Sequence, residues 1–212
     1  MDDLIIQTKG LTRRFKNVIP VKDLTLSVRH GETFELVGAD GAGKTTTMRM
    51  LAAIMNPSQG SATVAGFDAV DEPEPIKECI GYVAHQFNLY GDLTVIENLH
   101  FFADVFGVRG AERKRRVWRL LEFARLTEFK GRPAAHLTGG MQKKLSLAWT
   151  LIHQPDLLLL DEPTTGVDPV SRREFWDILT HLHLQGVTLL VSTPYMDKAD
   201  AARGWGSCTR GR

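Results

Sequence analysis

Short apolar runs of the kind that form β-strands recur along the first part of the chain and return near its end. These runs predict strands over Leu4–Lys9, Leu24–Val28, Thr33–Val37, Ser61–Val64, Gly81–Ala84, Leu157–Leu160 and Val187–Ser192. The last two read L-L-L-L and V-T-L-L-V-S, so both faces of these strands are apolar. Such strands are typical of the centre of a parallel sheet that helices cover on both sides.

Other stretches show the 3.6-residue periodicity of amphipathic helices. They predict helices over Lys44–Met55, Thr94–Phe106, Glu112–Leu126 and Pro169–Gln185. The second and fourth are followed by Gly107 and Gly186, and a glycine commonly ends a helix. The elements are therefore β-rich first, then helical, then strand–helix–strand. This order predicts the α/β fold class, with an N-terminal antiparallel β part and an inserted helical subdomain.

We interpret the chain, 1–212, as a single domain with its core over about 1–87 and 154–200. The helical subdomain is expected over about 88–153. Residues 201–212 lack periodicity and end abruptly, so we interpret them as an aberrant tail produced by a truncation or a frameshift.

Composition and charge narrow the class of partner. The net charge is +1, so the bulk field favours neither nucleic acid nor an anionic membrane. The basic cluster Arg113–Arg116 lies on an amphipathic helix, where a solvated face is the plain interpretation, and no nucleic-acid partner is expected. No apolar run approaches the roughly 18 residues that span a bilayer. If the protein acts at a membrane, another chain must do the spanning.

The stretch G-A-D-G-A-G-K-T-T-T connects a predicted strand to a predicted helix. It fits G-x-x-x-x-G-K-[ST], in which small glycines let backbone N–H groups fold around a polyphosphate at a helix N-terminus. Lys44 is expected to reach the β- and γ-phosphates, and the Thr45 hydroxyl to bind Mg²⁺. A plain glycine-rich turn is the weaker alternative, because of the flanking strand and helix. The nucleotide-binding residues predicted here are Gly38, Asp40, Gly41, Ala42, Gly43, Lys44, Thr45 and Thr46.

A second chemical signal ends the apolar strand L-L-L-L-D-E-P. Asp161 is placed to hold Mg²⁺ through its water shell, and Glu162 to polarise an attacking water. The predicted catalytic residues are therefore Glu162, Asp161 and Lys44, and the predicted cofactors are ATP and Mg²⁺. Together with the phosphate loop, this favours a P-loop NTPase core of the RecA-like kind.

With these motifs in place, the chain resembles the ATP-binding cassette (ABC) family over about residues 4–200. L-T-G-G-M-Q-K-K-L resembles the family's signature motif, and T-G-V-D-P resembles the loop that carries its Asp, here Asp168. G-Y-V-A-H-Q-F resembles the glutamine loop, and V-S-T-P-Y-M-D-K-A-D the histidine switch. Phe15 stands where the family places an aromatic ring that stacks on adenine. Finer details resemble the ATP-binding subunits of bacterial ABC-2 type multidrug and efflux exporters.

This resemblance implies a mechanism and partners. Two cassettes, identical or different, would meet head to tail, and residues of one signature motif would close over the γ-phosphate held by the other. These residues are Thr138, Gly139 and Gly140. Hydrolysis would drive integral membrane permease subunits, which contact the segment after His85, so the chain would be cytoplasmic and peripheral at the inner face of the plasma membrane. Gln86 is the glutamine expected to contact the nucleotide and its metal.

The sequence departs from the family pattern at two places. Pro194 occupies the position of the switch histidine, and His85 stands in register with the glutamine, which follows as Gln86. We expect ATP hydrolysis, because Lys44, Asp161 and Glu162 are intact. The alternatives are a degenerate module that binds nucleotide with little or no hydrolysis, and a soluble ABC ATPase without a transport role.

Overall fold

The computed structural model describes residues 3–86 and 89–194, which divide into two compact units. The first unit combines the described parts of 1–82, 156–162 and 183–212, and the second contains those of 83–155 and 163–182. The predicted tail over 201–212 lies outside the described residues. The interpretation of the chain as one functional domain stays a prediction.

The first unit begins with the antiparallel sheet that the sequence predicted. Strand β1 (Leu4–Phe15) pairs antiparallel with β2 (Val18–Leu24), β3 (Ser27–Arg29) and β5 (Gln59–Val64), and β5 pairs with β6 (Phe67–Asp68). The prediction for β1 was too short, because the strand continues beyond Lys9 to Phe15 and forms a hairpin with β2. The irregular register of that hairpin blurs the alternation by which its far half would be recognised.

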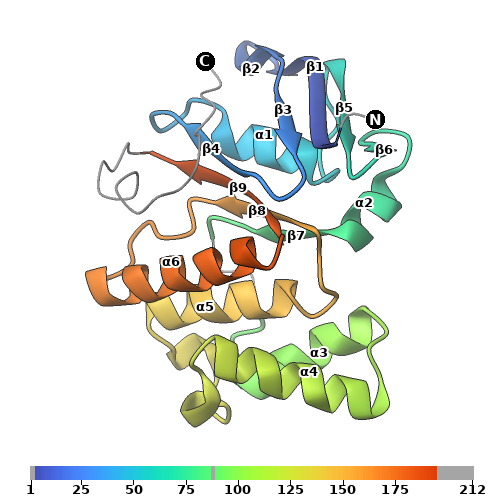
Figure 1. The fold of residues 1–212 in the computed structure, drawn as a ribbon. Helices are drawn as coiled ribbons and strands as arrows, with labels where there is room; N and C mark the ends of the chain where they lie inside the picture. The colour runs from blue at the N-terminus through green and yellow to red at the C-terminus, as the bar shows by residue number, and fades with distance from the viewer. Residues whose placement is uncertain (1–2, 87–88, 195–212) are drawn as a thin grey trace. The chain divides into compact units, whose positions relative to one another are not determined.

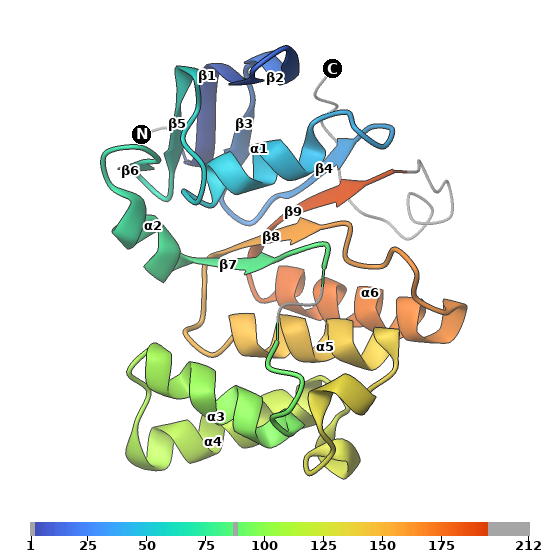
Figure 2. The same cartoon turned by 180° about the vertical axis from the view of Figure 1, so that it is seen from behind.

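The same unit contains a second sheet with the strand order β4-β9-β8-β7. These strands are β4 (Thr33–Val37), β9 (Thr188–Thr193), β8 (Leu157–Asp161) and β7 (Ile80–Val83). Strand β9 pairs in parallel with β4 and β8, and β8 is buried along its whole length, as its apolar sequence predicted. Helix α1 (Lys44–Leu51) lies between the two sheets (Figures 1 and 2) and buries Met48, Met50 and Leu51 in their shared core.

Helix α1 ends earlier than the predicted Met55, and the backbone shows why. Ala53 adopts a left-handed conformation with a φ of 53°, and the N–H of Ile54 donates to the carbonyl of Arg49. These are the features of a helix C-terminus that usually uses glycine, so the sequence carries no visible stop signal there. The short helix α2 (Pro73–Cys79) was also missed, although Pro73 occupies a favourable first helical position.

The second unit is helical, as expected for the central block. It contains α3 (Val95–Val105), α4 (Gly110–Phe123), α5 (Gly139–Thr150) and most of α6 (Pro169–Leu184), with 3₁₀ turns at Thr127–Phe129 and Ala134–His136. Helix α3 begins with a capping box between Thr94 and Glu97. None of the helices in the described part of the chain combines the length and apolar character needed to cross a bilayer.

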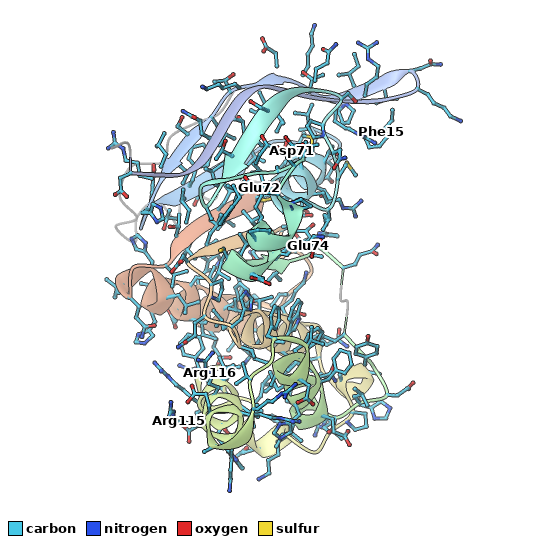
Figure 3. All side chains as sticks on the ribbon, turned by 90° about the vertical axis from the view of Figure 1, so that its right-hand side faces the viewer. Phe15, Asp71, Glu72, Glu74, Arg115 and Arg116 are labelled. Carbon is cyan, nitrogen blue, oxygen red and sulfur yellow. The ribbon has the colours of Figure 1, made fainter. Side chains whose placement is uncertain are left out.

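The basic cluster on α4 is paired with acidic side chains. Arg115 and Arg116 (Figure 3) both contact the carboxylate of Glu112, and Arg113 pairs with Asp104 at 2.6 Å. The apolar face of the helix, with Val117 and Leu121, is buried. The cluster is therefore held by ion pairs, and Arg116 also donates to the carbonyl oxygen of Ile152 at 2.8 Å.

Candidate functional site

The phosphate-loop sequence forms a turn between β4 and α1 that wraps around the ammonium group of Lys44. Its Nζ donates to the carbonyl oxygens of Gly38 at 2.7 Å and Ala39 at 3.1 Å. The side chain is only 5% exposed although it carries a charge. A buried cation held by two loop carbonyls is well placed to exchange them for phosphate oxygens.

Gly43 closes this loop against the β1–β2 hairpin. Its φ is 87°, a left-handed conformation at the residue before α1, and an added Cβ would lie 2.1 Å from the carbonyl oxygen of Pro20. No side chain fits at that distance, so the backbone of the hairpin supports the loop from behind. The glycine required by the sequence motif is thus also required by packing.

The two carboxylates at the end of β8 lie in different surroundings. Asp161 is fully buried, and its Oδ1 accepts a hydrogen bond from the Ser192 hydroxyl at 2.8 Å. Glu162 is partly exposed, and its Oε1 lies 3.1 Å from Nζ of Lys44. The structure therefore brings together Lys44 and Glu162, which the sequence placed 118 positions apart (162 − 44). The backbone of Glu162 is unusual, with a φ of 48°.

The Oδ2 atom of Asp161 is buried and finds no hydrogen-bond partner in residues 3–86 and 89–194. A buried carboxylate oxygen without a partner is costly, so a cation or a bound water is the natural occupant beside it. Mg²⁺ takes one or two protein oxygens and fills its shell with waters and phosphate oxygens. Asp161 and the hydroxyl of Thr45, in the first turn of α1, are donors of this kind. No group of three His, Cys, Asp or Glu side chains gathers at a potential metal site within the described ranges.

Tyr82 adds to the electrostatics of this site. Burial raises the pKa of its hydroxyl, and the negative charge of Asp161 raises it further. The hydroxyl therefore stays protonated at neutral pH, and it adds no negative charge beside the Asp161 carboxylate.

Phe15 ends β1, and its ring is 40% exposed (Figure 3). The guanidinium of Arg13 lies over one face, with its Cζ 4.5 Å from the ring centroid. Phe15 belongs to the same hairpin whose Pro20 contacts the phosphate loop. An exposed aromatic ring on this hairpin is able to stack on a nucleotide base.

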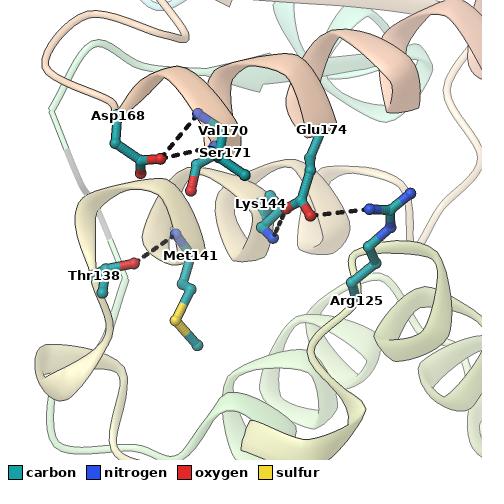
Figure 4. Close-up of polar contacts among 8 residues, drawn as sticks. All are labelled: Arg125, Thr138, Met141, Lys144, Asp168, Val170, Ser171 and Glu174. Carbon is teal, nitrogen blue, oxygen red and sulfur yellow. Dashed lines mark hydrogen bonds and ion pairs between the residues drawn. The ribbon is translucent and has the colours of Figure 1, made fainter.

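The remaining predicted site residues belong to the second unit. Thr138 caps α5, accepting a hydrogen bond from the Met141 N–H at 3.4 Å, so the glycines after it open the helix as predicted (Figure 4). Asp168 precedes α6, and its Oδ1 accepts from the N–H groups of Val170 at 3.1 Å and Ser171 at 2.9 Å. These hydrogen bonds, chiefly those from Ser171, lower the pKa of Asp168.

Ser171 also brings Asp168 and the signature motif together. An added Cβ on Gly140 would lie 2.4 Å from the Ser171 Cβ, so the two helix starts touch at this point. Deeper along the same pair of helices, Lys144 donates to Glu174 at 2.7 Å, and Arg125 joins the same carboxylate at 2.9 Å (Figure 4). The hydrogen bond from Lys144 is the main reason why the pKa of Glu174 is lowered.

This contact makes Gly140 sensitive to the smallest substitution. We expect Gly140→Ala to lower the free energy of unfolding by about 1–3 kcal/mol, because the new methyl group overlaps a fixed atom of Ser171. Gly139→Ala is the matched control, since nothing lies within 4 Å of an added Cβ there. Thermal unfolding of both variants tests this, and equal midpoints would contradict the close contact.

His85 and Gln86 are both exposed and follow β7. The ammonium of Lys143, on α5, donates to the carbonyl oxygen of His85 and lies 3.5 Å from that of Ala84. Lys143 is 9% exposed, and no local pattern in the sequence singles it out. A lysine adjacent to the signature glycines thus holds the backbone at the start of the glutamine-loop region.

Pro194 directly follows β9 and is half-buried. The residue before it, Thr193, accepts a hydrogen bond from the N–H of Gly38 at 3.3 Å, which ties the strand end to the start of the phosphate loop. Pro194 thus follows a residue bonded to the loop, yet its side chain has no donor or charge to offer a phosphate. The rest of the predicted switch region, after Pro194, lies outside the described residues.

Sequence reasoning missed one further residue of this site. Ser192 lies opposite Asp161 in the register of the parallel pair β8–β9. Ser192 lies within the stretch that resembles the histidine switch, but the sequence assigned it no role. Its contact with Asp161 depends on the register of two strands that are far apart in sequence.

Comparisons with known proteins agree with this geometry. A family model described as ABC transporter matches residues 21–165. A probable multidrug ABC transporter ATP-binding protein of Escherichia coli (strain K12) is 47% identical over 205 residues, which are 96% of this chain and 36% of that protein. A Nod factor export ATP-binding protein I of Cupriavidus pinatubonensis is 40% identical over 196 residues, which are 92% of this chain and 60% of that protein. The chain therefore spans less than two thirds of the length of these relatives.

Solved structures give the same answer for the fold. An ATP binding subunit of an ABC transporter superposes with a TM-score of 0.85 at 29% identity, covering 98% of this chain and 86% of the other. A dimeric ATP-binding cassette in a post-hydrolysis state, bound to ADP and Pi, superposes with a TM-score of 0.84 at 26% identity, covering 98% and 94%. The α/β fold predicted from the sequence is confirmed.

Proposed function

Because the chain belongs to the ABC transporter family, we propose that it is an ATP-binding and ATP-hydrolysing subunit of a bacterial exporter. The observation that carries the proposal is the pair of Lys44 and Glu162, joined at 3.1 Å beside a phosphate loop. A cation for the phosphates and a carboxylate for the attacking water are the two protein groups that hydrolysis of a nucleoside triphosphate requires.

The residues of the first unit would act in sequence. Lys44 exchanges the carbonyls of Gly38 and Ala39 for phosphate oxygens, and the loop N–H groups bind the rest of the polyphosphate. Glu162, released from Lys44, orients a water for attack and accepts its proton. Asp161 and Thr45 would hold Mg²⁺, which supplies charge neutralisation on the phosphates. Phe15 would stack on the adenine.

The second unit would complete the site of another copy or of a related cassette. Thr138, Gly139 and Gly140 open α5, so the N–H groups at this helix start are oriented to meet an anion. Two cassettes that meet head to tail would each present this helix start to the nucleotide of the other. Gln86 and Asp168 would contact nucleotide or partner from the same unit.

Membrane permease subunits are the proposed partners for coupling. The proposed contact segment follows His85, and Phe87 within it lies outside the described residues. Tyr90 is 52% exposed and packs edge-to-face on Phe101 with ring centroids 4.7 Å apart. An exposed aromatic pair of this kind favours contact with another protein. The chain would then act at the inner face of the plasma membrane.

Cell fractionation separates this proposal from a role away from membranes. In cells that carry the protein naturally, we expect the chain to sediment with the membrane fraction and to be released when the permease is deleted. Sedimentation with ribosomes, unchanged by that deletion, would favour a soluble non-transport ABC ATPase.

Proline at position 194, where the family has the switch histidine, favours a second candidate function: a nucleotide-binding module with little turnover. If the missing imidazole limits an otherwise competent site, Pro194→His adds a hydrogen-bond donor near the γ-phosphate. We then expect the rate of MgATP hydrolysis to rise about tenfold or more, since one such donor is often worth 10²–10³ in rate. Steady-state phosphate release measures this, with Pro194→Ala as the control that removes proline without adding a donor. An equal rise in both variants would mean that the removal of proline, and not the added imidazole, raises the rate.

A further inference from the structure

Ser192 is a buried hydroxyl at the end of β9 to which the proposed function assigns no role. Its side chain is fully buried, and its position in the parallel register is directly beside Asp161. Ser192 follows the three buried aliphatic residues Leu189–Val191 of β9, and its short polar side chain adds little to hydrophobic packing. A buried hydroxyl at this position therefore needs hydrogen-bond partners to offset the cost of its burial.

The hydroxyl makes two hydrogen bonds, one to each residue of the acid pair, Asp161 and Glu162. Its oxygen donates to Oδ1 of Asp161 at 2.8 Å and accepts from the backbone N–H of Glu162 at 3.0 Å. Among side chains of this size only a hydroxyl both donates and accepts strongly through one atom. A single oxygen thus joins the side chain of one carboxylate residue to the backbone of the next.

The first bond orients the carboxylate of Asp161 and leaves one of its oxygens for a ligand. Oδ1 is engaged by Ser192, while Oδ2 is buried without a hydrogen-bond partner among the residues that the structure describes. The bond from Ser192 restrains rotation of the carboxylate plane and so fixes the direction in which its second oxygen points. Hydrogen bonds that orient a metal-binding carboxylate commonly control the affinity for the metal.

The second bond holds the backbone of Glu162 in its unusual conformation. A φ of 48° is rare for a residue other than glycine and persists only where the surroundings fix it. From this conformation the Glu162 side chain reaches Lys44 at 3.1 Å. The hydrogen bond from the Glu162 N–H to Ser192 therefore helps to direct the Glu162 carboxylate toward the phosphate loop.

We propose that Ser192 is a positioning residue that sets the orientation of Asp161 and Glu162 through one shared hydroxyl. The proposal rests on the proposed function of this site as a place where MgATP is bound and hydrolysed. Under this proposal, metal binding and turnover both depend on the Ser192 hydroxyl, which lies on β9 two residues before Pro194. The strand thus serves the acid pair through Ser192 and the phosphate loop through Thr193.

The test replaces Ser192 with Ala and compares metal binding with turnover. We expect the affinity for Mn²⁺, measured by electron paramagnetic resonance with the non-hydrolysable analogue AMP-PNP, to fall roughly 10- to 100-fold. We expect kcat for MgATP to fall by a similar factor, while the affinity for AMP-PNP without metal stays unchanged. Ser192→Thr keeps the hydroxyl and is expected to restore both quantities.

Thr188→Val is the matched control, because Thr188 is a buried hydroxyl residue at the other end of β9. Its Oγ1 accepts from the N–H of Gly31 at 2.9 Å, so the variant also removes a buried hydrogen bond. We expect it to lose stability while its Mn²⁺ affinity and kcat stay at the wild-type values. If Ser192→Ala matches this control in both quantities, Ser192 is structural only and the proposal is wrong.

A second variant and the metal readout keep the proposal testable under other outcomes. If Ser192→Ala does not fold, Ser192→Cys replaces it, since it keeps the volume and lacks a strong donor. If the wild type binds Mn²⁺ but releases no phosphate, hydrolysis as the proposed function fails. The Mn²⁺ affinity of the variant then still decides the role of Ser192 by itself, because it does not depend on turnover.

Discussion

Replacing Glu162 with Gln is expected to slow ATP hydrolysis by at least about 100-fold while ATP remains bound, because a positioned base is worth 10²–10⁴ in rate. The amide keeps the shape of the side chain but removes the charge that accepts the proton. Because Glu162 pairs with Lys44 at 3.1 Å, the change also removes the carboxylate that competes with phosphate for that ammonium. ATP affinity is therefore expected to be equal or higher.

Single-turnover phosphate release, with ATP binding measured on the same sample, separates these two effects. Glu72→Gln is the matched control, because it makes the same chemical change at an exposed glutamate before α2 (Figure 3). The control is expected to keep wild-type turnover. If Glu162→Gln also keeps it, the attacking water is activated elsewhere and the assignment of Glu162 is wrong.

The second large effect is expected from Gly43→Ala. The new methyl group would overlap the Pro20 carbonyl, and the residue would also keep a left-handed φ of 87°. Overpacking costs about 1–3 kcal/mol and left-handed strain about 1–2 kcal/mol, so the free energy of unfolding is expected to fall by about 3 kcal/mol. In a protein of this size the unfolding midpoint falls by roughly 6–12 °C. ATP binding is expected to be lost with the shape of the loop.

Gly41→Ala separates the clash from the backbone strain. Its φ of 80° is similar, but nothing lies within 4 Å of an added Cβ. Only the strain is expected, at about 1–2 kcal/mol. Thermal unfolding of the two variants gives the comparison, and a drop of the same size in both would show that the hairpin yields to the methyl group.

Local signals explain why so much of the fold was predictable from the sequence. The helix starts at Thr94 and Pro169 carry capping chemistry, and the aliphatic run of β8 predicts its complete burial. The phosphate loop is equally local, since its glycines, lysine and helix start are consecutive. The confirmed family and α/β fold follow from signals of this kind.

What could not be predicted depends on the pairing of distant segments. The role of Ser192 follows from the parallel register with Asp161, which no local pattern encodes. The same is true of Gly140, whose tight packing depends on Ser171 of another helix, and of the contact between Gly43 and Pro20. Ala53 ends α1 in a conformation that its sequence does not announce.

Phosphate release from MgATP by the purified wild-type chain tests the central claim most directly. The account predicts release that stops when Mg²⁺ is chelated and that is slowed at least about 100-fold in Glu162→Gln. ATP bound by the wild type without phosphate release, in this chain and in Pro194→His alike, would contradict the claim that Lys44, Asp161 and Glu162 form a hydrolytic site.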